Sequence, residues 1–188
     1  MINIFFELIL SKTFISVKLP SNLLAKLIFD ENNNPVGRGS SISLDEATEQ
    51  AENAISLSKL ESAKKRTNGI PTADEFTKAL NHLNLPSGHW NMLKAHYRAP
   101  QRKLTSFQLE EAAGYKHFSA ANSQYGTLGR KIAEFLGVMP EGTYANGEPL
   151  WITILTNANS ESLEKDTGYY QHILRDEVAT ALENVGNN

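Results

Sequence analysis

The sequence contains no cysteine among its 188 residues. Disulfides and thiol chemistry are therefore excluded, and so are zinc fingers, whose ligand sets include cysteine. Long hydrophobic runs are missing too, because the apolar start MINIFFELIL is too short to span a bilayer. This start includes an acidic residue and shows neither a basic beginning nor a small-residue cleavage site. We therefore expect no targeting signal, no membrane segment and a cytoplasmic protein.

Motifs that carry catalysis are also missing. The sequence has no glycine-rich phosphate loop, no GxSxG or HExxH motif and no carboxylate pair at an informative spacing. His82, His89 and His96 recur every seven residues, which invites a metal-binding interpretation. No Asp or Glu follows any of them by three or four residues, so we expect surface or boundary histidines instead. The sequence predicts a protein that is not an enzyme and holds no metal or cofactor.

Charge is unevenly distributed along the chain. The formal net charge of −3 argues against a histone-like nonspecific binder of nucleic acid. Residues 89–131 nevertheless carry +5, whereas residues 1–88 carry −1 and residues 132–188 carry −7. The seven basic residues of the middle segment are Lys94, Arg98, Arg102, Lys103, Lys116, Arg130 and Lys131. A basic segment inside an acidic chain is expected of a face that binds a polyanion.

The stretch from Thr105 to Leu136 predicts two short helices joined by a tight turn, the pattern of a helix-turn-helix. Thr105 and Gln108 form a capping box at the start of the first helix, and Gly114 suits the left-handed conformation that ends it. Residues 115–118 form the turn, and Ser119 is expected to cap the second helix. Helical pairs of this kind also occur in cores that never touch DNA, so the local basic charge decides the interpretation.

The second helix has two distinct faces. Its apolar stripe consists of Ala121, Tyr125, Leu128, Ile132 and Phe135. The opposite face carries Ser119, Asn122, Ser123, Gly126 and Arg130. Glycines such as Gly126 and Gly129 would let another backbone approach, and Asn122 lies in the first turn, where such helices contact bases. Asn122 could pair with adenine, or it could simply support the cap or the turn. The candidate nucleic-acid-binding residues are Lys103, Lys116, Ser119, Asn122, Ser123, Gln124, Arg130 and Lys131.

Several strings in this region resemble a known module. They are AAGY at 112–115, FSAAN at 118–122, YGTLGR at 125–130, HYRAP at 96–100 and LRDEVATALE at 174–183. The module is found in uncharacterised bacterial proteins, alone or alongside HNH-type restriction nucleases, and the resemblance covers about residues 72–186. It implies a DNA-related setting such as restriction, defence or a phage. Because the sequence contains no HNH portion, the resemblance does not imply cleavage.

We expect three parts along the chain. Residues 1–39 form an apolar extension or a small β element, with short elements at Ile2–Leu10, Ser16–Leu19 and Leu23–Phe29. Asp30–Gly39 is rich in turn residues and marks a boundary; a poorly packed leader is the alternative. Residues 40–70 form a long amphipathic helix, Leu44–Arg66, and a linker, with Ser43 as the cap. The cluster Lys64–Arg66 would complement the helix dipole or contact phosphate.

Residues 71–188 form the third part. Helices from Thr72 to Leu83 and from Pro86 to Pro100 should support the helical pair. Leu150–Leu155 and Tyr169–Leu174 are rich in β-branched and aromatic residues and predict two strands. The polar loop Asn157–Gly168 between them would make a wing. We expect phosphate to repel this loop, because it carries several acidic residues. A last helix, Asp176–Val185, follows.

These patterns predict a mainly α fold with a small β-hairpin, of the α+β class. We expect a winged helix-turn-helix-like core with an N-terminal extension that contains a long helix. The predicted function is that of a bacterial DNA-binding protein that reads duplex DNA. The alternative is a protein-interaction module, such as a DNA-mimicking or phage-encoded anti-defence inhibitor, that docks through its acidic C-terminal part. A protein partner and a homodimer are both left open.

Overall fold

The chain divides into two compact units, Met1–Lys65 and Arg66–Asn188. The computed structural model describes residues 4–9, 12–18, 24–29, 35–41, 43–157 and 170–186. Helices and small antiparallel sheets make up both units, which confirms the α+β class. The predicted boundaries at 39/40 and 70/71 differ from this division, because the long helix packs on the strands that precede it. Across the described residues, no helix combines the length and apolar character that a membrane crossing needs.

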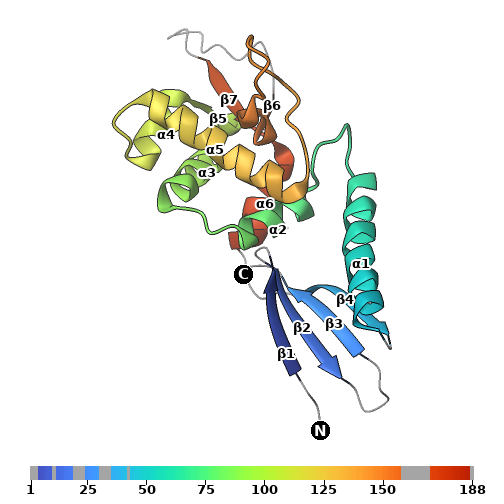
Figure 1. Ribbon diagram of the computed structural model, residues 1–188. Coiled ribbons are helices and arrows are strands. Elements are labelled where there is room, and N and C mark those ends of the chain that lie inside the picture. The colour runs from blue at the N-terminus through green and yellow to red at the C-terminus, as the bar shows by residue number, and fades with distance from the viewer. Residues whose placement is uncertain are drawn as a thin grey trace. The chain divides into compact units, whose positions relative to one another are not determined.

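The first unit is a four-stranded antiparallel sheet with one helix (Figure 1). Its elements are β1 (Ile4–Ile9), β2 (Lys12–Lys18), β3 (Leu24–Phe29), β4 (Pro35–Ser41) and α1 (Leu44–Lys64). The strands follow the order β1-β2-β3-β4, and α1 packs on β4 and β3. Ser43 occupies the N-cap position as expected, but its side chain makes no capping bond.

The strand β4 corrects the sequence prediction, which assigned Asp30–Gly39 to a turn-rich boundary. The glycines serve packing instead. A Cβ atom at Gly39 would lie 1.8 Å from the carbonyl oxygen of Ala47, and one at Gly37 would lie 2.6 Å from that of Ala51. Both alanines are fully buried. Small residues on both elements therefore let the backbone of α1 approach β4 closely.

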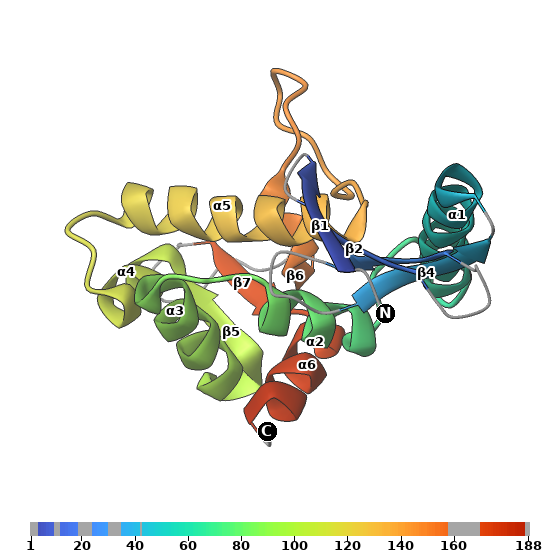
Figure 2. The same cartoon turned by 60° about the horizontal axis from the view of Figure 1, so that its bottom comes forward.

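In its described residues, the second unit contains five α-helices and a small sheet (Figures 1 and 2). The helices are α2 (Ala73–His82), α3 (Ser87–Arg98), α4 (Ser106–Ala113), α5 (Phe118–Leu136) and α6 (Asp176–Gly186). The sheet has the order β5-β7-β6, with β5 at Lys103–Thr105, β6 at Thr156–Asn157 and β7 at Gln171–Leu174. Two 3₁₀ turns, η1 (Pro100–Arg102) and η2 (Trp151–Ile154), complete it. Phe76, Leu93, Leu128, Ile132 and Leu155 lie in its core with no exposed surface.

The prediction of a strand at Leu150–Leu155 is wrong. Most of this segment forms η2. The two residues of β6, which come directly after it, are the ones that pair with β7. Local bonds replace the ladder: both the backbone N–H and the hydroxyl of Thr153 donate to the carbonyl of Leu150. The predicted second strand contains β7, and the last helix is confirmed as α6. Residues 158–169, which hold most of the predicted polar loop, its acidic residues and Tyr169, lie outside the described residues.

Arg66 ties the start of the second unit together. Its guanidinium bonds to both carboxylate oxygens of Glu75 and donates to the carbonyl of Leu136 at 2.9 Å. Glu75 also completes the capping box of α2 with Thr72, the helix start that the sequence predicts. Burial alone would raise the pKa of Glu75, but the bonds from Arg66 and Thr72 outweigh it and the pKa is lowered. Arg66 is therefore an internal anchor rather than the end of the long helix or a phosphate contact.

Candidate nucleic-acid interface

The two helices α4 and α5 form the predicted helical pair. Thr105 and Gln108 make the expected capping box, and Gly114 ends α4 in the left-handed conformation with a φ of 71°. The expected cap at Ser119 is wrong, because α5 begins two residues earlier than such a cap would place it, at Phe118, with His117 in the N-cap position. The ring of Phe118 packs on Phe107 of α4, with ring centroids 4.9 Å apart. This contact holds Phe118 at the helix start and leaves Ser119 inside the first turn.

The inner face of α5 anchors the helix in the core, as its apolar stripe predicts. Ala121, Tyr125, Leu128 and Ile132 are completely buried. Gly129 is buried as well, and a Cβ atom there would lie 2.2 Å from the carbonyl oxygen of Trp151. The close backbone approach that the glycines suggest therefore occurs at Gly129, but it is made by η2 of the same unit.

A projecting hairpin stands beside the outer face of α5 (Figure 2). It spans residues 142–150 and is closed by bonds from the N–H of Leu150 to the carbonyl of Gly142 and from that of Tyr144 to the carbonyl of Glu148. Asn146-Gly147 forms its tip, and Gly147 has a φ of 84°. At its base, the buried guanidinium of Arg175 bonds to the carboxylate of Glu141. This hairpin is not among the elements predicted from the sequence, although Asn-Gly is a strong hairpin signal.

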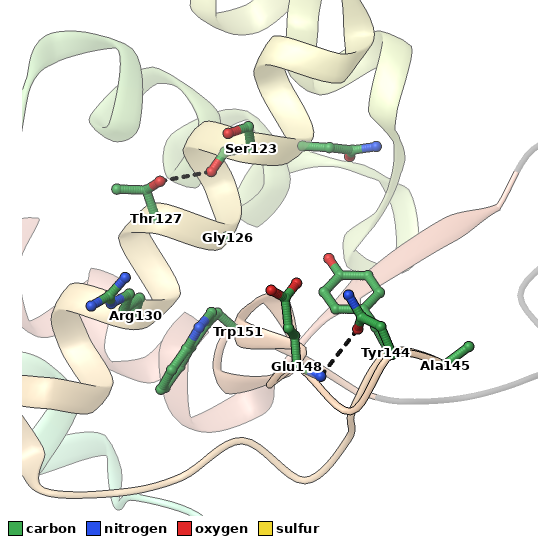
Figure 3. Close-up of a pocket in the computed structure, with 10 residues that line it drawn as sticks. Ser123, Gly126, Thr127, Arg130, Tyr144, Ala145, Glu148 and Trp151 are labelled. Atoms are coloured by element: carbon green, nitrogen blue, oxygen red, sulfur yellow. Dashed lines mark hydrogen bonds between the residues drawn. The ribbon is translucent and has the colours of Figure 1, made fainter.

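The hairpin and α5 enclose a groove of about 770 Å³, which we call the α5 groove (Figure 3). It is lined by Asn122, Ser123, Gly126, Thr127, Arg130, Tyr144, Ala145, Asn146, Glu148 and Trp151. Apart from the adjacent residues and backbone of α5 itself, no atom of the described residues lies within 4 Å of the position that a Cβ of Gly126 would take, so this part of the helix is open. The guanidinium of Arg130 lies 6.0 Å from the ring centroid of Trp151 and pairs with Glu134 at 2.7 Å. Polar, aromatic and charged groups thus converge on one concave surface.

Three of the predicted site residues, Asn122, Ser123 and Arg130, lie together in the α5 groove. Asn122 also accepts a hydrogen bond from the hydroxyl of Ser106 at 2.7 Å. Gln124 is turned toward α3, where its side-chain oxygen lies 3.1 Å from Nε2 of His89. The other four are not among the residues that line this groove. Ser119 and Lys116 are exposed at the start of α5 and in the turn before it, Lys103 is half-buried in β5, and Lys131 is exposed on α5.

The basic segment does not fold into one continuous face. Lys94 and Arg98 line a different groove, between α3 and α6. Arg102 pairs with Asp176 of α6 at 2.7 Å. Charge that is contiguous in the sequence is therefore shared among separate surfaces, and part of it is matched by the acidic C-terminal segment.

A buried polar network runs from the core to the α5 groove. Nε2 of His96 donates to the carbonyl of His172 at 2.9 Å, so Nδ1 accepts from the hydroxyl of Tyr125 at 2.8 Å. Nε2 of His172 lies 3.3 Å from the hydroxyl of Ser106, which in turn donates to Asn122. Burial lowers the pKa of His96 to about 4 and, with the neighbouring His96, that of His172 to about 4.

The expectation of surface or boundary histidines is wrong for two of the three residues. His89 and His96 are almost completely buried, because both lie on the side of α3 that faces α5 and their rings find partners there. Burial lowers the pKa of His89. His82 is half-buried and packs on Phe135, with ring centroids 4.5 Å apart. Within the part of the chain that the structure describes, no group of three or more His, Cys, Asp or Glu side chains could hold a metal ion.

No family model, curated protein or solved structure matches the chain. The resemblance to the bacterial module found alone or alongside HNH-type nucleases therefore stays a prediction.

Proposed function

We propose that the second unit binds duplex DNA through the outer face of α5. The observation that carries this proposal is the composition of that face. Ser123, Gly126 and Thr127 form an open, small and hydrogen-bonding row on a helix whose other side is fixed in the core. Such a surface can approach base edges without large side chains in the way. Arg130, one turn further along, adds a positive charge beside it.

The order of the elements supports the same proposal. A helix (α3), a strand (β5), two helices (α4 and α5) and two strands (β6 and β7) follow one another, and β7 lies in the middle of the sheet. We take this as a winged helix-turn-helix, in which α5 is the recognition helix that enters the major groove. The loop between β6 and β7, where the wing would be, lies outside the described residues. The hairpin at 142–150 would then be a second projection beside the DNA.

The side chains of the α5 groove have the chemistry that DNA needs. Asn122 can pair with an adenine edge, and arginine binds either phosphate or guanine. The ion pair of Arg130 with Glu134 does not oppose this, because both side chains are more than half exposed. Exposed pairs of this kind contribute about 1 kcal/mol or less, so Arg130 can exchange Glu134 for DNA at small cost.

The alternative proposal is a protein-interaction module that docks through the acidic C-terminal part. The structure offers less support for it. Glu134, Glu141 and Asp176 each pair with an arginine of the same unit, so much of the described acidic charge is already matched. A gel-shift assay that detects no DNA binding, together with co-purification of a basic partner protein, would favour this alternative.

We also propose that the protein acts by binding alone, in a cytoplasmic restriction, defence or phage setting. Neither the resemblance nor the residues of the α5 groove supply a cleavage chemistry. Plasmid DNA incubated with the protein and magnesium or manganese should stay intact, and dose-dependent nicking by a clean preparation would refute this part of the proposal.

A charge placed on the outer face of α5 tests the proposed function. Ser123→Glu adds a carboxylate to an exposed position, and a fluorescence-anisotropy titration with a labelled duplex measures its effect. We expect affinity to fall about tenfold or more, because like charges brought together at an interface cost several kcal/mol. Ser58→Glu is the matched control, since it places the same charge on an exposed position of α1. Equal affinity of the two variants would contradict the proposal.

A further inference from the structure

The α5 groove contains a carboxylate where a surface for DNA phosphates should have none. Glu148 is exposed on the hairpin, and its side chain points between Tyr144 and Trp151 toward Gly126 of α5 (Figure 3). Of the residues that line the groove, Glu148 is the only acidic one. A carboxylate in this position repels phosphate, so it would weaken nonspecific binding to DNA.

The hairpin does not need this carboxylate for its own structure. Glu148 is joined to the turn through its backbone, since its N–H donates to the side-chain oxygen of Asn146 at 3.1 Å and its carbonyl accepts from Tyr144 at 2.7 Å. An amide side chain at position 148 would leave both bonds in place. The backbone of Glu148, and not its carboxylate, therefore makes the two bonds that hold the turn.

A carboxylate accepts hydrogen bonds and donates none, which restricts the base edges it can bind. In the major groove, cytosine presents the N4 amino donor, whereas adenine places the N7 acceptor beside its amino group. Guanine, the partner of cytosine, presents two acceptors that suit an arginine. Arg130 lines the same groove as Glu148, so the two charged side chains of the groove are one acceptor and one donor.

We infer that the α5 groove reads a C·G base pair, with Glu148 accepting from cytosine N4 and Arg130 donating to guanine. This inference rests on the DNA-binding function proposed above and adds the base pair that the groove selects. Glu148 is then a specificity-determining residue: it lowers affinity for DNA in general and favours one base pair at one position.

Selection from a pool of randomised duplexes, followed by sequencing of the bound fraction, tests this inference on the intact protein. The wild type should enrich C·G at one position, and Glu148→Gln should lose at least about fivefold discrimination there, the lower limit for a good base contact. The other positions should keep their preferences, and affinity for unrelated duplexes should rise. Glu111→Gln is the charge-matched control, because Glu111 is exposed on α4 and does not line the groove.

The outcomes separate this inference from the function on which it rests. Wild-type protein that binds no duplex refutes both. Wild-type protein that selects a site without a C·G position, or Glu148→Gln protein with an unchanged selection profile, refutes the inference and leaves DNA binding standing. Thermal unfolding of Glu148→Gln should match that of the wild type, which excludes a loss of selection through misfolding.

Discussion

His96 shows how one buried side chain can set the response of the second unit to acid. The folded state holds the pKa of His96 and of His172 at about 4, chiefly through burial. An unfolded histidine has a pKa of about 6.5, so the unfolded state binds more protons between pH 4 and 6.5. The free energy of unfolding should therefore be highest above pH 6.5 and fall as the pH drops toward 4. Each histidine contributes at most about 1.4 kcal/mol per pH unit.

Urea unfolding between pH 4 and 8 measures this effect. The slope below pH 6.5 should be smaller in His96→Gln than in the wild type, because the variant lacks one of the buried histidines whose pKa is lowered. The stability of the variant at pH 7.5 should be lower. Identical slopes in both proteins would show that His96 is not held neutral by the fold, and stability that rises as the pH falls would contradict the account for His172 as well.

Gly126 and Gly129 lie one turn apart on α5, so alanine substitutions at the two positions can be compared for their effect on the free energy of unfolding. Gly129→Ala should destabilise the second unit by roughly 1–3 kcal/mol, since its methyl group would meet the backbone of Trp151. Gly126→Ala meets open space and should stabilise α5 by roughly 1 kcal/mol. The denaturant concentrations at the midpoint of unfolding, measured for both variants and the wild type, test these two expectations. A Gly129→Ala protein as stable as the wild type would mean that α5 and η2 are further apart than described.

The sequence predicts local features of single residues better than their distant partners. The capping boxes at Thr72 and Thr105 join residues three apart, so their pattern is visible in the sequence. The partners of Asn122 and Gln124 are Ser106 and His89, which are 16 and 35 residues away. No spacing rule connects such pairs, and only the packing of α4 and α3 against α5 brings them together.

At the scale of elements, α5 presents Asn122 both to the α5 groove and to α4. Asn122→Ala should lower the preference for a cognate site by roughly 1–3 kcal/mol and leave nonspecific affinity almost unchanged. It should also cost about 1 kcal/mol of stability, because the bond with Ser106 is lost. Ser106→Ala removes the same bond from the other side and is the matched control. If Asn122→Ala keeps its site preference, Asn122 only supports the helical pair.

The sequence predicts the helices of the second unit better than it predicts η2 and β4. Helices of the second unit carry apolar stripes and caps, so their positions are close to the predicted ones. Trp151–Ile154 has the composition of a strand, yet its backbone lies on Gly129 of α5 and turns as η2. Likewise, β4 is rich in glycine because α1 packs on it. In each case tertiary packing overrides local preference.

At the scale of the whole molecule, the proposed DNA-binding surface belongs to one of the two units. The described contacts of the candidate interface all lie between residues 66 and 186, and the first unit adds a separate sheet and helix. The sequence predicted the α+β class and the helical pair, but it did not predict that the long helix belongs with the strands. That grouping depends on contacts between Gly39 and Ala47, which a linear pattern does not reveal.

The salt dependence of duplex binding by the intact protein tests the central claim most directly. If about four basic side chains contact phosphates, log K should fall with log salt at a slope near −4, since each contact contributes on the order of 0.9. Lys131→Ala should weaken binding to all sequences about equally and reduce the slope by about one, because Lys131 is exposed on α5 and does not line the α5 groove. Affinity that stays the same between low and moderate salt, or no duplex binding at any salt concentration, would contradict the account.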